Sequence, residues 1–125
     1  MAKKSTQPLG PFQLEWLEAL ESGKFEQGSD FLRSADDKFC CLGVACELSG
    51  VKAVLMNRSG ITRYEYLGER HYLPKEIVDK LKFRDNDGSG GLSRSIAQLN
   101  DEGKTFKEIA ATIRANPFRY FTAPA

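Results

Sequence analysis

The chain has 125 residues and a formal net charge of +1, with 18 Lys and Arg against 17 Asp and Glu. This balance argues against nucleic-acid binding through bulk positive charge, because that mode needs a basic face that neutralises several phosphates. Hydrophobic residues make up 41% and charged residues 28%, which is typical of a folded globular domain and not of a disordered chain. No apolar run approaches the length of a membrane span or of a secretion signal, so we expect a cytoplasmic protein with no membrane partner.

The N-terminal region predicts a flexible arm followed by an amphipathic helix. Residues 1–10 are polar and marked by Pro and Gly, so we expect order to begin near Pro11. Ser22-Gly23 supplies a helix stop, and the apolar face before it comprises Phe12, Trp16, Leu17 and Leu20. We predict an arm over residues 1–10, one globular domain over residues 11–121 and a tail over residues 122–125.

All three cysteines lie in the segment 39–48, where we predict a helix that begins at Cys41 and ends near Gly50. Unpaired cysteines are often buried, so a packed core helix is the favoured interpretation. The alternative is a reactive thiolate at Cys41, stabilised by the free N–H groups of the first helical turn. The cysteine spacing is unlike that of metal-binding pairs and the chain has one histidine, so we expect neither a metal nor a cofactor.

The middle of the chain has the pattern of strands joined by turns. Residues 25–40 predict a small hairpin around the Asp36-Asp37 turn. Residues 51–73 are rich in β-branched and aromatic side chains with turn sequences between them, which predicts a small antiparallel sheet. Leu73-Pro74 then opens a helix, because proline is tolerated in a first helical turn, and a mobile loop follows at residues 85–91.

The C-terminal third predicts two helices joined by a tight turn. The first is marked by Leu92, Ile96 and Leu99 and ends at Gly103. Thr105-x-x-Glu108 has the pattern of a capping box for the second, which stops at Asn116-Pro117. The aromatic tail at residues 118–121 should dock or bind something, because exposed aromatics would form a sticky patch. We therefore predict an α+β fold, a single compact domain of about four helices with a small antiparallel sheet.

Two alternative functions, DNA binding and cysteine-dependent hydrolysis, would each depend on a few residues of this fold. The helical hairpin at residues 92–115 resembles the first two helices of a helix-turn-helix DNA-binding regulator, but the chain leaves no room for a recognition helix after it. A small cysteine hydrolase would pair Cys41 with His71, the only imidazole in the chain. A surface or half-buried histidine is the better default interpretation of His71.

A third hypothesis is a ligand site built from polar residues beside the best-defined elements. Arg33 offers a bidentate fork for a phosphate, and Gln27 and Asn100 offer paired donors and acceptors. Asp101 lies next to them in the sequence, and Tyr66 offers a stacking face, as do Tyr64 and Tyr72. The alternative is that the polar residues of this set cap turns and that Arg33 pairs with the aspartates of the Asp36-Asp37 turn. We expect Arg33, Gln27, Asn100, Asp101 and Tyr66 to bind the ligand.

A set of motifs spans most of residues 12–114: Trp16-x-x-Ala19-Leu20-x-Ser22-Gly23, Gln27-Gly28, Leu32-Arg33, Phe39-Cys40-Cys41-Leu42-Gly43, Leu73-Pro74 and Leu99-Asn100-Asp101-x-Gly103-x-x-Phe106-x-x-Ile109-Ala110. In these motifs the chain resembles a group of small uncharacterised proteins encoded by bacteriophages and prophages. This resemblance implies a viral accessory protein of the host cell cytoplasm, with a host-takeover or anti-defence role. We expect stoichiometric binding rather than turnover, with a phosphorylated, nucleotide-type small molecule or a host protein as partner; self-association stays open.

Overall fold

A computed structural model describes residues 9–89 and 95–124. Within these residues the helices are α1 (Pro11–Ser22), α2 (Cys41–Leu48), α3 (Lys75–Leu81), α4 (Ile96–Asp101), α5 (Phe106–Ala115) and α6 (Pro117–Tyr120). The strands are β1 (Arg33–Ser34), β2 (Ala53–Arg58) and β3 (Ile61–Tyr66), which form an antiparallel sheet in the order β1-β3-β2. The predicted α+β class is confirmed.

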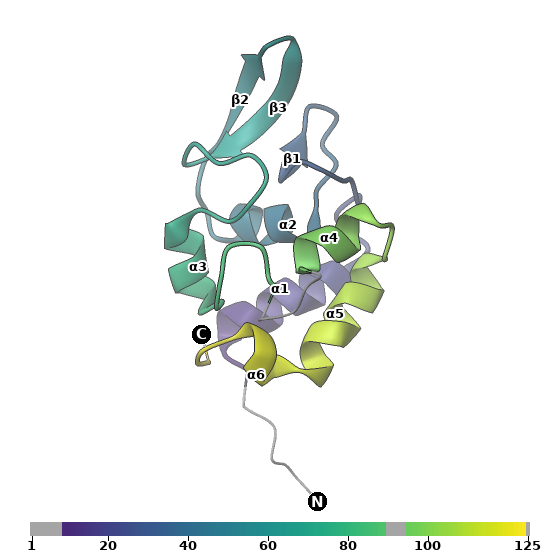
Figure 1. The fold of residues 1–125 in the computed structure, drawn as a ribbon, viewed down its shortest axis with the longest axis vertical. Coiled ribbons are helices and arrows are strands. Elements are labelled where there is room, and N and C mark those ends of the chain that lie inside the picture. Colours follow the sequence, from purple (N-terminus) through teal and green to yellow (C-terminus); the bar gives the residue numbers. More distant parts are fainter. Residues whose placement is uncertain (1–8, 90–94, 125) are drawn as a thin grey trace, which may run out of the picture.

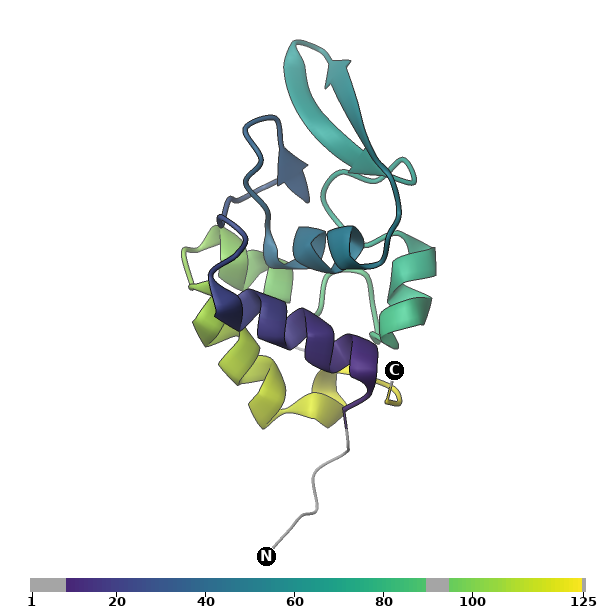
Figure 2. The same ribbon diagram turned by 180° about the vertical axis from the view of Figure 1, so that it is seen from behind.

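The β2–β3 hairpin projects from one end of a body made of helices (Figure 1). Seen from behind, α1 crosses the body beneath α2 and lies beside α5 (Figure 2). The core lies between these helices, where Trp16, Leu17 and Leu20 of α1 are at most 1% exposed. Among the described residues no helix is long and apolar enough to cross a bilayer.

Helix ends follow the local signals of the sequence. Gly23 takes a left-handed φ of 79° immediately after α1, as a terminating glycine does. At the start of α5 the Thr105 hydroxyl accepts a hydrogen bond from the Glu108 N–H at 3.1 Å, and the Glu108 carboxylate accepts one from the Thr105 N–H at 2.9 Å. The predicted capping box is therefore confirmed. Leu92 and residues 1–8 of the predicted arm over residues 1–10 lie outside the described residues, as do the last two residues of the loop at 85–91.

The β2–β3 hairpin turns at Ser59 and Gly60, whose φ angles of 53° and 82° are those of a two-residue turn with both central residues left-handed. Its register pairs Arg58 with Ile61 and Met56 with Arg63. Because paired residues share a face and alternate residues of a strand point to opposite faces, Arg58, Arg63 and Glu65 lie on one face. Tyr64 and Tyr66 lie on the other face of the same strand.

The predicted hairpin at residues 25–40 forms only in part. Residues 34–38 make the expected tight turn, since the Ser34 N–H donates to the Lys38 carbonyl at 2.9 Å. The segments on either side of the turn also bond each other, since Arg33 and Phe39 form an antiparallel bridge and the Cys40 N–H donates to the Leu32 carbonyl at 3.3 Å. This pairing is short, and β1 also pairs with β3, so the predicted hairpin becomes the edge of the three-stranded sheet.

The aromatic tail docks onto the core through α6, a short helix that the sequence analysis did not predict. Tyr120 and Phe121 are at most 2% exposed, and the Phe121 ring packs 5.4 Å from that of Phe83. The Arg84 N–H donates to the Tyr120 carbonyl, which ties the tail to the segment after α3. Of its three aromatic side chains, only that of Phe118 stays largely exposed, at 56%.

An ion pair between α1 and α5 predicts an acid-sensitive contribution to stability. Arg114 donates to both carboxylate oxygens of Glu21 at 2.7 and 3.0 Å, which lowers the pKa of Glu21 from 4.5. A lowered folded pKa means that the stabilisation is present above pH 4.5 and is lost as the pH falls through the folded pKa. Both side chains are 36% exposed, so we expect Glu21→Gln to cost at most about 1 kcal/mol at pH 7. Urea unfolding at a series of pH values should show this difference vanish in acid, and a constant difference would contradict it.

Candidate functional site

A cleft of about 1240 Å³ lies between one face of the β2–β3 hairpin and the helical body. We call it the hairpin cleft. The hairpin, the loop after it and the segment before β1 supply one wall, and the segments before α4 and along α4 supply the other. Its lining residues are Asp30, Phe31, Cys40, Arg58, Ser59, Ile61, Arg63, Arg70, His71, Tyr72, Asp87, Ser89, Ser95, Ala97, Gln98 and Asp101.

The hairpin wall is cationic. Arg58, Arg63 and Arg70 line it, and Glu65 binds two of them: its Oε2 accepts from Arg58 Nε at 2.8 Å and from Arg63 Nη2 at 3.2 Å. The hydrogen bond from Arg58, together with the charges of both arginines, lowers the pKa of Glu65. One carboxylate thus serves two guanidinium groups, so this cluster keeps a positive charge beside the cleft.

Arg63 is the most constrained of these arginines. The residue is 4% exposed, and its Nη1 donates to the Ile61 carbonyl at 3.2 Å. Its Nε is buried and has no hydrogen-bond partner among the described residues. Buried polar groups in native proteins are nearly always hydrogen-bonded, because an unpaired donor loses its water without compensation. The Arg63 fork therefore has unused hydrogen-bonding capacity at the wall of the cleft.

Three aromatic rings lie along the same wall. His71 stacks on Phe31 with ring centroids 5.3 Å apart and an interplanar angle of 16°. Its Nδ1 also lies against the backbone carbonyl of Asp30. Tyr72 follows with 46% of its surface exposed, and it lines the same cleft as Arg58. We call Phe31, His71 and Tyr72 the aromatic shelf.

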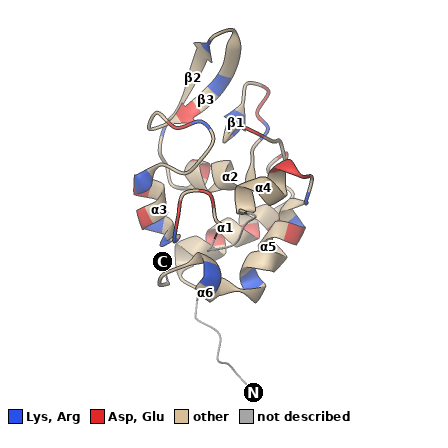
Figure 3. Ribbon diagram, viewed as in Figure 1, with Lys and Arg blue, Asp and Glu red and all other residues tan. Residues whose placement is uncertain are grey.

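The opposite wall is rich in oxygen acceptors. Asp87, Asp101 and Gln98 line it, together with two serines. Asp101 already accepts the Asp30 N–H at 2.9 Å, and Asp87 accepts the Ser89 N–H at 3.0 Å. Coloured by charge, the ribbon has basic segments on the hairpin and acidic ones on the loop before α4 and at the end of α4 (Figure 3). The cleft is therefore dipolar.

No group of three His, Cys, Asp or Glu side chains is placed to hold a metal ion in residues 9–89 and 95–124.

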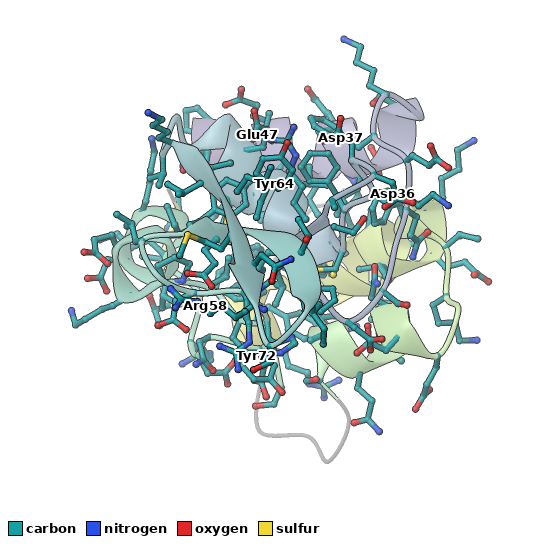
Figure 4. All side chains as sticks on the ribbon, turned by 90° about the horizontal axis from the view of Figure 1, so that it is seen from above. Asp36, Asp37, Glu47, Arg58, Tyr64 and Tyr72 are labelled. Carbon is teal, nitrogen blue, oxygen red and sulfur yellow. The ribbon has the colours of Figure 1, made fainter. Side chains whose placement is uncertain are left out.

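Arg33 and Tyr66, two of the five residues predicted to bind a ligand, lie on the other face of the sheet. Arg33 donates to Asp37 at 2.8 and 3.0 Å and to Glu47 at 3.5 Å, and its guanidinium lies 4.0 Å from the ring centroid of Tyr64. Tyr66 is buried and donates its hydroxyl to Glu47 at 2.9 Å. In Figure 4 Glu47, Tyr64 and Asp37 lie on the side of the hairpin opposite Arg58. The ion-pair alternative for Arg33 is therefore confirmed, and its fork is used within the chain.

Gln27 and Asn100 do come together, but as an internal cross-link. Gln27 Nε2 donates to Asn100 Oδ1 at 3.0 Å and to the Lys104 carbonyl at 2.7 Å. Asn100 is 2% exposed and also bonds the backbone of Gly28 and Cys41. Both amides are thus engaged in joining the segment before β1 to α4. Of the five predicted residues, Asp101 is the one that lines the hairpin cleft.

The cysteines form the core of α2. Cys41 is fully buried and its Sγ donates to the Ile96 carbonyl at 3.8 Å, so the packed-core interpretation is confirmed. Burial raises the pKa of Cys41 well above 9.0 and that of Cys40 to about 12. A nucleophilic cysteine needs the opposite shift, because the thiolate is the reactive form. His71 lies half-buried on the cleft wall, so nothing in this arrangement of the described residues activates Cys41.

The helical hairpin of α4 and α5 turns at Gly103, whose φ is 96°. It packs on the core through Ile96, Ile109 and Ile113, all of them fully buried. The helix that follows, α6, has four residues and folds back against the core. A recognition helix must lie in the major groove with several side chains on base edges, and α6 is too short for that. The geometry of these residues therefore favours a structural role for the hairpin.

The sequence analysis missed Arg58, Arg63 and Arg70. The signal that would have found Arg63 is the alternation Arg63-Tyr64-Glu65-Tyr66 in a strand, which places a charged pair on one face and two tyrosines on the other. Such a charged pair inside an otherwise buried strand needs partners or a ligand. The sequence did not show which of the two faces would meet the helical body.

Comparison with known proteins places the chain in a family without assigning it an activity. A family model described as "Domain of unknown function (DUF8296)" matches residues 12–117, from α1 to the first residue of α6. A search of curated proteins found no match, and a search of solved structures found none either. The functional argument therefore depends on the hairpin cleft.

Proposed function

Because the chain belongs to the DUF8296 family, whose description assigns no activity, we propose from the site geometry that it binds a small phosphorylated ligand stoichiometrically in the hairpin cleft. In line with the resemblance to phage proteins, we propose that it acts in a host cell by withholding that ligand. The cleft is large enough for such a molecule, since ligand sites usually measure about 300–1,000 Å³.

The observation that carries the proposal is the unused donor of Arg63. Its guanidinium is held by Glu65 and the Ile61 carbonyl, so it is oriented before any ligand arrives. A planar fork of this kind matches two oxygens of a phosphate, and a preoriented fork loses little side-chain entropy on binding. Arg58 and Arg70 line the same wall and supply further positive charge.

Binding rather than turnover is supported by the state of the cysteines. All three thiols are buried, and their pKa values are raised by that burial. Cys40 lines the cleft, but burial raises the pKa of its thiol to about 12, so the thiol is kept protonated, as are those of Cys41 and Cys46. The other groups that line the cleft are mainly guanidiniums, aromatic rings and acceptors, which hold and orient a ligand.

A second candidate function is the blocking of a host protein. The hairpin exposes three large aliphatic side chains, Val54, Leu55 and Ile61, at 46%, 55% and 51%. Exposed apolar side chains gathered on one projecting element are typical of an interaction surface. This candidate makes the hairpin the binding element and leaves Arg63 without a role.

Replacing Arg63 tests the phosphate proposal directly. Arg63→Met keeps the aliphatic bulk and removes the fork, while Glu65 keeps Arg58 at 2.8 Å, so the fold should survive. We expect binding of pyrophosphate, sugar phosphates or nucleoside phosphates to weaken at least about tenfold, the value of one charge-assisted hydrogen bond. Isothermal titration calorimetry measures the affinity, and thermal melting checks the fold.

Arg33→Ala is the matched control, because Arg33 belongs to the same sheet, also pairs with carboxylates and lies on the other face. It should leave the affinity unchanged. If no phosphate compound binds, or if Arg33→Ala weakens binding as much as Arg63→Met does, the proposed site is wrong. Capture of a host protein that is lost on Leu55→Ser would then favour the second candidate.

A further inference from the structure

We infer that the ligand of the hairpin cleft is a nucleotide whose base carries an exocyclic amino group and lies on the aromatic shelf of Phe31, His71 and Tyr72. This inference rests on the proposed phosphate site and names the class of ligand that it takes. Three features carry it: the position of the shelf next to the arginines, the exposure of Tyr72, and the acceptors of the opposite wall.

The shelf and the arginines belong to one continuous wall. Arg70, His71 and Tyr72 are consecutive, and all three line the same cleft as Arg58 and Arg63. A phosphate held by Arg58 and Arg63 therefore has aromatic rings in the same cleft. Nucleotides are the small phosphorylated molecules that combine a polyanion with a flat π face, and they use both features in protein sites.

Tyr72 is the ring that is open to a ligand. One face of His71 is covered by Phe31, at a centroid distance of 5.3 Å, so this pair forms a rigid base for the shelf. Tyr72 is tilted by 57° from His71 and is 46% exposed. An exposed tyrosine next to a stacked pair of rings offers its face at little entropic cost, because only two side-chain torsions have to be ordered.

The hydrogen-bond acceptors on the wall opposite the aromatic shelf favour a base that has a hydrogen-bond donor on its edge. Asp87, Asp101 and Gln98 line that wall. A carboxylate has two oxygens and about four lone-pair sites, so Asp101 can accept a ligand donor as well as the Asp30 N–H. Carboxylates repel phosphate but accept hydrogen bonds from amino groups. The dipolar cleft therefore suits a ligand with phosphates at one end and an amino-bearing base at the other.

Calorimetry with ADP, GDP, CDP and UDP, and with ribose 5-phosphate and pyrophosphate as base-free probes, tests the inference. We expect ADP, GDP or CDP to bind at least about tenfold more tightly than ribose 5-phosphate and than UDP, which has no exocyclic amino group. Tyr72→Leu should remove that advantage while leaving pyrophosphate binding unchanged. In one-dimensional NMR the base protons should shift upfield with wild type, and the Tyr72→Leu variant should abolish the shift.

Phe118→Leu is the control for the loss of an exposed aromatic ring, because Phe118 is 56% exposed on α6, at the end of the body away from the hairpin (Figure 1). It should bind all probes as wild type does. If pyrophosphate and ribose 5-phosphate bind as tightly as every nucleotide and Arg63→Met still weakens them, the nucleotide inference fails and the phosphate site stands. If no probe binds, the phosphate site itself is wrong.

Discussion

Gly43→Ala should prevent stable folding, because a Cβ at this position would lie 1.7 Å from the Leu32 carbonyl oxygen and 2.6 Å from its carbonyl carbon. The obstacle is backbone, so no side-chain rotation relieves it. Leu32 is itself fixed on both sides: its N–H donates to the Arg70 carbonyl, and its carbonyl accepts from the Cys40 N–H. We expect a loss of at least about 4 kcal/mol, which is a large part of the stability of a domain of this size.

Urea unfolding followed by circular dichroism measures this loss, and Gly103→Ala separates close approach from backbone strain. Gly103 has a φ of 96°, and a Cβ added there would meet no neighbouring atom within 4 Å. Alanine at this position therefore carries only the cost of a left-handed backbone, about 1–2 kcal/mol. A loss at Gly43 no larger than that at Gly103 would mean that α2 and the β1 segment move apart easily. The close contact of α2 with Leu32 would then have no structural importance.

Asn100→Ala should destabilise the domain by about 3 kcal/mol, because one side chain satisfies three polar partners in a buried place. Asn100 Oδ1 accepts from the Cys41 N–H at 3.1 Å and from Gln27 Nε2 at 3.0 Å, and Nδ2 donates to the Gly28 carbonyl at 2.7 Å. Cys41 is the first residue of α2, where the backbone N–H groups have no partner inside the helix. Asn100 thus caps α2 from a distant part of the chain.

Asn57→Ala is the control, since Asn57 is exposed on the hairpin and its amide donates to the Thr62 hydroxyl. It should change the unfolding free energy by no more than about 0.5 kcal/mol. Ligand binding by the surviving folded fraction distinguishes the two roles considered for Asn100. If the Asn100→Ala variant melts like wild type but binds no phosphate compound, Asn100 belongs to the ligand site and its role as a cap is contradicted.

The local elements were predictable because their signals lie within a few residues of each other. Gly23 ends α1 through its left-handed backbone, and Thr105 and Glu108 cap α5 across three positions. The turn at Ser59 and Gly60 sets the hairpin register for the same reason. The packed-core interpretation of Cys41 also followed from residue type alone, because a small apolar thiol is stabilised by burial.

The candidate site depended on tertiary structure. Arg33 lies in β1 and Arg63 lies in β3. From the sequence alone, Arg33 was the arginine predicted to bind the phosphate. In the fold Arg33 meets Asp37 and Glu47, which use its fork, whereas Arg63 shares Glu65 with Arg58 and keeps a buried donor without a partner among the described residues. The same applies to Asn100, which pairs with Gln27 from 73 positions away and so becomes a cap.

What the sequence by itself determined is most of the secondary structure, the α+β class and the burial of the cysteine helix, since each depends on hydrophobic period, turn residues and caps. What only the tertiary structure decided is which polar side chains stay available to a ligand. Hydrogen bonds and ion pairs between distant segments occupy the donors of Arg33, Gln27 and Asn100. The Nε of Arg63 has no partner among the described residues, because Arg63 shares the single carboxylate of Glu65 with Arg58.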